Sequence, residues 1–235
     1  MILTEPARRR MLLGMALLAA AGLARPRPAG AADPLRILVL GDSIAAEYGI
    51  ARGSGWVSEL ADRAGEGVDF INASISGETT AGGRTRLPGL LGEHRPDVVI
   101  IELGGNDALR GLQLDASEGN LDAMVEAAKQ AGARVLVLGM QVPPNYGRRY
   151  TERFAGIFAT VAERHDAALV PFLLEKVSDG LAYFQDDRIH PNESAQPLIA
   201  DTVWPALAPL LEEAGAIDGK PAAGARDRDR TGKAG

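Results

Sequence analysis

The sequence predicts an α/β protein, in which a five-stranded parallel sheet is covered on both faces by helices as a three-layer α/β/α sandwich. Two observations predict it. Short apolar runs alternate with helical patterns from Arg36 onward, and such alternation implies right-handed crossovers between parallel strands. The run at 98–101, Val-Val-Ile-Ile, contains no polar side chain. It therefore indicates a strand buried on both faces, as in a parallel sheet.

The predicted strands are short apolar runs, each followed by a segment rich in glycine or polar residues. Branched aliphatic side chains dominate them, and their lengths are typical of buried strands. The five runs are residues 36–41, 68–74, 96–107, 133–140 and 168–172.

Between these runs, apolar residues recur every three or four positions, the spacing that places them on one face of a helix. Gly65 and Gly132 close two of these segments, as glycine often does where a helix ends. The five predicted helices are residues 54–65, 79–91, 117–132, 150–164 and 194–213.

The first 31 residues have the composition of a secretory signal peptide. Three arginines at 8–10 precede an uncharged apolar run at 11–24, and Ala-Gly-Ala at 29–31 provides a cleavage site of small residues. Fourteen residues are too few to span a bilayer as a helix. We therefore predict export, to the periplasm or out of the cell. The arginines also resemble a twin-arginine signal that lacks the usual phenylalanine, so the export route stays open.

The rest of the chain predicts one folded domain and a tail. Residues 32–216 hold all the predicted strands and helices, with no internal repeat and no linker. Residues 217–235 have almost no large apolar side chain, so we expect a disordered tail there.

Composition excludes several classes of function. Without residues 1–31, which carry five arginines and one glutamate, the net charge is about −10. Such a charge argues against nucleic acids and anionic membrane surfaces as partners. The chain has no cysteine, which excludes disulfides, thiolate metal sites and a cysteine nucleophile. Its three histidines and its carboxylates do not match the spacing of zinc ligands, so we predict no metal.

Ser43 follows the first predicted strand, in the sequence Gly41-Asp42-Ser43. Sites in open parallel sheets gather beyond the carboxyl ends of the strands. A serine there can act as a nucleophile if a base lies within hydrogen-bond reach. Taken alone, the motif is more typical of a turn or a helix cap.

The segment Asp187-Arg188-Ile189-His190 can supply that base. His190 would accept the serine proton, and Asp187, three residues earlier, can reach the other ring nitrogen and stabilise the imidazolium. Asp186 is one residue further away and is less suited. Taken alone, His190 is more typical of a solvated or capping histidine before Pro191, which we expect to start the last helix.

An oxyanion hole requires N–H groups aimed at the charge that develops on the substrate. Gly77 follows the second predicted strand, Asn106 lies in the Gly-Gly-Asn-Asp segment at the end of the third, and the Ser43 N–H is a third donor. Taken separately, Gly77 and Asn106 are more typical of turns.

Together, and in this order, these residues resemble the SGNH (GDSL) hydrolase family. The matching segments are 41–43, Gly77, 104–107 and 187–190, within a similarity that covers about residues 33–213. The resemblance implies a flavodoxin-like α/β/α sandwich. It also implies an acyl hydrolase that acts on esters and thioesters, as an arylesterase, acyl-CoA thioesterase or lysophospholipase.

The resemblance also implies roles for the matching residues. Ser43 would be the nucleophile, His190 the general base and acid, and Asp187 the carboxylate that orients it. The N–H groups of Ser43 and Gly77 and the Asn106 amide would form the oxyanion hole. No cofactor is implied.

Two further features follow from the resemblance. Pro143, Asn145 and Tyr146 lie on the loop after the fourth predicted strand and would border the acyl pocket, although a plain surface loop is nearly as compatible with each of them. Glu47 departs from the family, which commonly has glycine there. A carboxylate so close to Ser43 in sequence would alter the pH dependence or repel anionic substrates.

We therefore expect an exported monomeric serine hydrolase with a small acyl ester or thioester as substrate. Export weakens acyl-CoA as the natural substrate, since that metabolite is cytosolic. One alternative is a carbohydrate O-acetyl esterase of the same fold. Another is a non-catalytic binding module, which would predict loss of Ser43, Asp187 or His190; all three are present.

Overall fold

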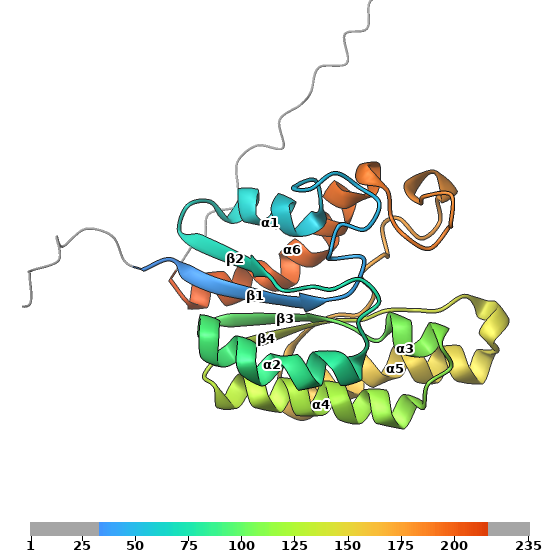
Figure 1. Cartoon of the computed structure of the whole chain (residues 1–235), viewed down its shortest axis with the longest axis horizontal. Helices are drawn as coiled ribbons and strands as arrows, with labels where there is room; N and C mark the ends of the chain where they lie inside the picture. Colours follow the sequence, from blue (N-terminus) through green and yellow to red (C-terminus); the bar gives the residue numbers. More distant parts are fainter. Residues whose placement is uncertain (1–32, 216–235) are drawn as a thin grey trace, which may run out of the picture. The chain divides into compact units, whose positions relative to one another are not determined.

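The structure, a computed structural model, describes residues 33–215 (Figure 1). The predicted signal peptide (1–31) and tail (217–235) lie outside the described residues. Five strands form one sheet: β1 (Leu35–Gly41), β2 (Val68–Asn72), β3 (Val98–Glu102), β4 (Arg134–Leu138) and β5 (Ala168–Val170).

The sheet has the strand order β2-β1-β3-β4-β5, and every neighbouring pair is parallel. β1 and β3 lie side by side, with Gly41 opposite Glu102 at their carboxyl ends. All five residues of β3 are buried, as its uninterrupted aliphatic sequence predicts. The predicted five-stranded parallel sheet is confirmed.

Helices cover both faces of the sheet. α1 and α6 lie on one face, and α2, α4 and α5 on the other (Figure 1). None of the helices within residues 33–215 combines the length and apolarity needed to cross a bilayer. The helices are α1 (Trp56–Ala64), α2 (Thr80–His94), α3 (Gly105–Leu109), α4 (Leu114–Gln130), α5 (Arg148–His165) and α6 (Gln196–Glu213), with short 3-10 turns η1 (Pro144–Tyr146), η2 (Leu181–Tyr183) and η3 (Glu193–Ala195).

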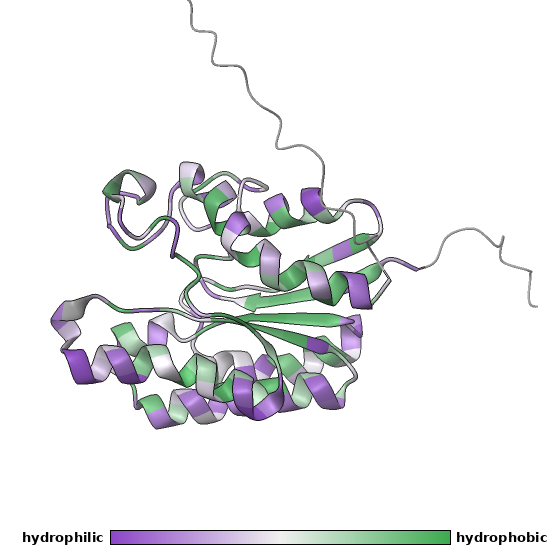
Figure 2. Ribbon diagram, turned by 180° about the vertical axis from the view of Figure 1, so that it is seen from behind, coloured by the Kyte–Doolittle hydropathy of each residue, from purple (hydrophilic) through white to green (hydrophobic). Residues whose placement is uncertain are grey.

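The core lies between the sheet and the two helical layers. Figure 2 shows hydrophobic strands at the centre and helices with mixed surfaces outside them. Trp56 and Leu60 of α1, Leu87 of α2, and Phe154 and Phe158 of α5 are fully or almost fully buried in this core. The core therefore holds the strands in place, and the loops beyond their carboxyl ends remain for chemistry.

Two expectations about individual elements were wrong. Residues 104–107 were expected to end a strand, but Gly105 begins the short helix α3. Pro191 does not start the last helix. It pairs with Phe184 in an isolated antiparallel bridge, and Asn192 caps the turn that follows by accepting the Ser194 N–H. The segment from Phe184 to Pro191 is thus a closed loop rather than the approach to a helix.

A candidate active site at the carboxyl edge of the sheet

Ser43 stands on a tight turn directly after β1. Its neighbour Asp42 organises the turn, because the Asp42 carboxylate accepts the Ile44 N–H at 3.0 Å and the Asp42 carbonyl accepts the Ala46 N–H at 2.9 Å. Ser43 itself is only partly buried. The turn therefore presents the serine hydroxyl beyond the end of a central strand.

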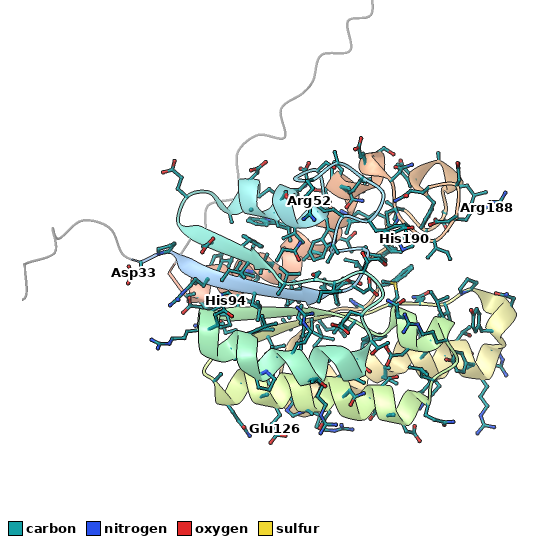
Figure 3. All side chains as sticks on the ribbon, viewed as in Figure 1. Asp33, Arg52, His94, Glu126, Arg188 and His190 are labelled. Carbon is teal, nitrogen blue, oxygen red and sulfur yellow. The ribbon has the colours of Figure 1, made fainter. Side chains whose placement is uncertain are left out.

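His190 reaches Ser43 from the other end of the chain. The distance between Ser43 Oγ and His190 Nε2 is 2.9 Å, and that between His190 Nδ1 and Asp187 Oδ2 is 2.6 Å. Figure 3 shows His190 among the loops beyond the carboxyl ends of the strands. The structure thus joins the predicted serine, histidine and aspartate in one hydrogen-bonded chain.

The Asp187 carboxylate is held by the loop that carries it. Its Oδ1 accepts the N–H groups of Ile189, at 2.9 Å, and His190, at 3.0 Å. Arg188, which lies between Asp187 and Ile189, adopts a left-handed φ of 58°. The hydrogen bond from the His190 ring and these two N–H groups lower the pKa of Asp187 to about 2.

This carboxylate also fixes the tautomer of His190. An ionised carboxylate can only accept a hydrogen bond, so Nδ1 of His190 must carry a proton. In the neutral ring Nε2 is then an acceptor, and the Ser43 hydroxyl donates to it. Asp186, the alternative considered from sequence, is not the residue that bonds to the ring.

An aromatic contact that the sequence did not reveal also positions His190. The Tyr48 ring lies against the imidazole, with centroids 4.4 Å apart and planes inclined by 41°. The His190 carbonyl accepts the Gln185 N–H at 2.8 Å, and Gln185 Nε2 donates to the Tyr48 carbonyl at 2.8 Å. Tyr48, Gln185 and His190 therefore form one connected support.

Gly77 and Asn106, the predicted oxyanion donors, follow the two strands that flank β1. Strands β2 and β3 pair with β1 on either side, so these residues lie at the same edge as Ser43. Asn106 Nδ2 donates to Asp42 Oδ2 at 3.0 Å. That bond uses one of the two N–H groups of the amide. Gly77 has a left-handed φ of 80°, which favours glycine.

Two buried carboxyl groups lie beneath the Ser43 turn. One is Asp42, which organises the turn; the other, Glu102, was not recognised from the sequence. Glu102 is 2% exposed, and its Oε2 accepts the Asp42 N–H at 3.1 Å. Burial raises the pKa of Glu102 well above its ordinary value, and the neighbouring Asp42 charge raises it further. Burial also raises the pKa of Asp42.

Asp107 braces the start of α2. Its carboxylate accepts the Thr80 N–H at 2.9 Å, the Thr80 hydroxyl at 2.5 Å and the Ser117 hydroxyl at 3.0 Å. Thr79 caps the same helix by accepting the Gly82 N–H. These bonds fasten the segment after Gly77 to the helices on its face of the sheet.

Glu47 does not face the reaction as a free carboxylate. It accepts the N–H groups of Gly53, at 3.0 Å, and Gly55, at 2.9 Å. Gly55 is the residue before α1, so the carboxylate braces the start of that helix, where negative charge is favourable. The residue that departs from the family pattern therefore has structural contacts of its own.

The loop predicted to bind substrate borders a cavity of about 460 Å³. Tyr146 lines this cavity together with Leu114 and Tyr150, and the two tyrosine rings stack with centroids 6.0 Å apart. Pro143 and Asn145 are exposed on the same loop.

Large exposed apolar side chains gather at the same edge. Each of the five loops that follow a strand carries at least one of them. They are Tyr48, Ile75, Leu109, Leu112, Tyr146, Leu181 and Ile189. Within residues 33–215, no group of three or more histidine, aspartate or glutamate side chains is arranged to hold a metal ion.

A parallel α/β/α sandwich with a hydrogen-bonded serine, histidine and aspartate at its carboxyl edge is an architecture of serine hydrolases. The chain belongs to the GDSL-like lipase/acylhydrolase family, whose model matches residues 39–196.

Known relatives are similar over most of their length. Esterase TesA of Pseudomonas aeruginosa is 51% identical over 178 residues, which cover 74% of this chain and 89% of the relative. Thioesterase 1/protease 1/lysophospholipase L1 of Escherichia coli K12 is 44% identical over 183 residues, 78% of this chain and 87% of the relative. A crystal structure of TesA superposes with a TM-score of 0.72 at 50% identity, covering 75% of this chain and 99% of that one.

Proposed function

We propose that this protein is a serine hydrolase that cleaves carboxylic esters and thioesters through an acyl-enzyme. The observation that carries the proposal is the hydrogen-bonded chain from Ser43 Oγ through the His190 ring to Asp187. Membership of the acylhydrolase family and similarity to relatives named as esterases and a thioesterase support it.

In the first half of the reaction, Ser43 Oγ attacks the carbonyl carbon while His190 Nε2 takes the hydroxyl proton. The carbonyl oxygen becomes an oxyanion, which the N–H groups of Ser43 and Gly77 and the Asn106 amide would stabilise. Collapse of the tetrahedral intermediate breaks the bond to the alcohol or thiol. That leaving group takes the proton from His190, and the acyl group remains on Ser43.

In the second half, water enters and gives a proton to His190 Nε2 as its oxygen attacks the acyl-enzyme. The second tetrahedral intermediate releases the carboxylic acid and returns the proton to Ser43. Asp187 stays ionised throughout, since its pKa is about 2. It stabilises the imidazolium in both halves without taking the proton.

The surroundings of Ser43 favour an apolar acyl group. The exposed apolar side chains lie on the segments that follow the strands, and Leu114, Tyr146 and Tyr150 line the cavity beside the loop after β4, together with Arg148, Arg149 and Arg153. We place Pro143 and Asn145 beside Tyr146 on the substrate side of this loop. Esters and thioesters share the same tetrahedral chemistry, so the leaving group is not restricted by the three reacting residues.

The sequence supports a cellular location for this activity. The composition of residues 1–31 favours export to the periplasm or beyond, with residues 32–216 as the hydrolase domain of a monomer. In that setting esters and lysophospholipids rank above acyl-CoA as natural substrates, because acyl-CoA is a cytosolic metabolite.

The test is hydrolysis of p-nitrophenyl esters from acetate to palmitate by the chain from residue 32 and by its Ser43→Ala variant. We expect hydrolysis by the unchanged enzyme and a loss of at least about 10³-fold in the variant, with acyl chains longer than acetate preferred. A strong preference for acetate would favour the O-acetyl esterase alternative. Equal activity of the variant, or no activity on any chain length, would contradict the proposal.

A further inference from the structure

The buried carboxyl group of Glu102 has no place in the reaction described above, yet it contacts the turn that carries Ser43. It is the last residue of β3, in the register position opposite Gly41. Its Oε2 accepts the Asp42 N–H at 3.1 Å. Glu102 thus holds the backbone directly before Ser43.

Gly41 has no side chain because this carboxyl group occupies the space that one would fill. A Cβ built on Gly41 would lie 2.7 Å from Glu102 Oε2 and 2.9 Å from Ser74 Oγ. Both distances are shorter than real Cβ contacts allow. The same Cβ would lie 2.8 Å from Ala45 Cβ, so a glycine just before the Asp42-Ser43 pair leaves room for Glu102 and for the turn that follows β1.

The Asp42 carboxyl group is the other buried acid beside Glu102: Asp42 is 3% exposed and Glu102 2% exposed, and the Asp42 N–H bonds to Glu102. Two neighbouring buried carboxyl groups are not stable when both are charged, so one of them carries a proton that it can donate to the other. The Asp42 carboxylate accepts the Ile44 N–H and one N–H of the Asn106 amide, each at 3.0 Å. Those donors, and the positive charge that His190 acquires, favour the ionised form of Asp42. The proton therefore belongs on Glu102.

We propose that Glu102 is a positioning residue which, as a neutral acid, donates a hydrogen bond to Asp42 and holds the Ser43 turn and the Asn106 amide in register. This inference rests on the proposed function, since it assigns how Ser43 and Asn106 are kept in place. Glu102 touches neither the substrate nor the reacting atoms. It acts through Asp42, which links the turn after β1 to the start of α3.

The charged groups around this pair come from several elements. Asp42 is on the adjacent strand end, and His190 faces Asp42 from the last loop. On the α2 side, Arg86 bonds to the Ala73 carbonyl and to Glu78. Asp107 of α3 is fully engaged with Thr80 and Ser117. Among these groups Asp42 is the one in direct contact with Glu102.

The test compares Glu102→Gln, which keeps the shape and neutrality of the acid, with Glu102→Leu, which removes its polar atoms. We expect Glu102→Gln to retain kcat within about threefold near neutral pH. Glu102→Leu should lower kcat about 100-fold with little change in KM, the size of effect seen when an oxyanion donor is lost. Circular dichroism establishes whether Glu102→Leu folds; if it does not, the Gln variant alone decides.

The pH profile supplies a readout that a merely structural role would not move. In the unchanged enzyme, loss of the Glu102 proton as the pH rises places a second negative charge beside Asp42. We expect kcat to fall there, and we expect Glu102→Gln, which has no proton to lose, to keep its activity to higher pH. Glu118→Gln is the matched control: it makes the same change on α4, away from this pair, and should leave the alkaline limb in place.

Three results would overturn the inference: a Glu102→Gln variant as impaired as Glu102→Leu, a folded Glu102→Leu variant with full kcat, or identical alkaline limbs in the Gln variant and the unchanged enzyme. Ser43→Ala separates this failure from failure of the proposed function. If Ser43→Ala retains hydrolysis, the function is wrong. If Ser43→Ala is inactive and one of the three results is obtained, only the role of Glu102 is wrong.

Discussion

At the scale of single residues, His190 depends on one contact from its own loop and on another from a distant part of the sequence. Asp187 holds one ring nitrogen at 2.6 Å, and the Tyr48 ring covers a face of the imidazole. Tyr48 is itself 51% exposed, so its contact with His190 matters more for the ring's orientation than for the core.

Removing the Tyr48 ring should therefore reduce activity without unfolding the protein. We expect Tyr48→Ala to lower kcat about fivefold, the effect of losing one aromatic contact, and Tyr48→Phe to restore it. Steady-state kinetics of a soluble short-chain ester would measure both, with thermal unfolding as the control. A Tyr48→Phe variant as slow as Tyr48→Ala would mean that the hydroxyl, not the ring, is responsible.

The residue scale also shows what the sequence can reveal about a site. Ser43, Asp187 and His190 were each weak candidates alone, and only the order of motifs along the chain singled them out. Glu102 and Tyr48 carried no such signal. Glu102 was an acidic residue at the end of an apolar run and Tyr48 one aromatic residue in a loop. Their importance comes from pairing between β1 and β3 and from a loop more than a hundred residues later.

At the scale of elements, α4 and α5 are joined by a set of ion pairs. Arg153 and Arg164 of α5 bond to Glu118 of α4, and Arg164 also bonds to Asp122. The hydrogen bonds from Arg153 and Arg164 lower the pKa of Glu118, and those from Arg164 and His165 lower the pKa of Asp122. Both arginines are largely exposed, so solvent screens the pairs.

These depressed pKa values give the helix pair a pH dependence. A carboxylate with a lower pKa in the folded state stabilises the fold above its unfolded pKa, and this stability is lost as the pH falls through the folded pKa. We expect Glu118→Gln to lower the unfolding midpoint by about 1–3 °C at pH 7, and the difference to shrink below about pH 4. Thermal unfolding at several pH values would measure it. A constant difference at all pH values would show that the lost contact is not ionic.

Element prediction from sequence succeeded where periodicity was strong. The Val/Ile run of β3 and the amphipathic pattern of α4 predicted their structures directly. The short helix α3 was missed because its five residues, Gly105–Leu109, offer less than two turns of pattern. Pro191 misled because proline often begins helices. In this structure Pro191 pairs with Phe184 in an antiparallel bridge and does not begin a helix.

At the scale of the whole molecule, the chemistry is confined to one edge of the sheet. The parallel strands bring five loops together there, and the large exposed apolar side chains of the described residues lie on those loops. The net charge of the chain is −6, but this edge of the sheet combines exposed apolar residues with Ser43, the proposed nucleophile. We therefore expect the apolar side chains at this edge, and not the net charge of the chain, to favour a substrate with an apolar acyl group.

The fold class was predictable in full because it depends on the alternation of strands and helices, which the sequence carries locally. The distances at the site were not, because they depend on how β1, β2 and β3 align and on where the last loop closes. The order of motifs along the chain identified the candidate site residues. The distance of 2.9 Å between Ser43 Oγ and His190 Nε2 depends on the folded arrangement of the Ser43 turn and the last loop.

The central claim is that Ser43 forms a covalent bond to the acyl carbon, and trapping tests it most directly. A fluorophosphonate bearing an alkyl chain would be incubated with the chain from residue 32, and intact mass and peptide mapping would locate the adduct. We predict one phosphonyl group per chain, on Ser43, formed much more slowly by His190→Ala and not at all by Ser43→Ala. An adduct on another residue, or equal labelling of Ser43→Ala, would contradict the account.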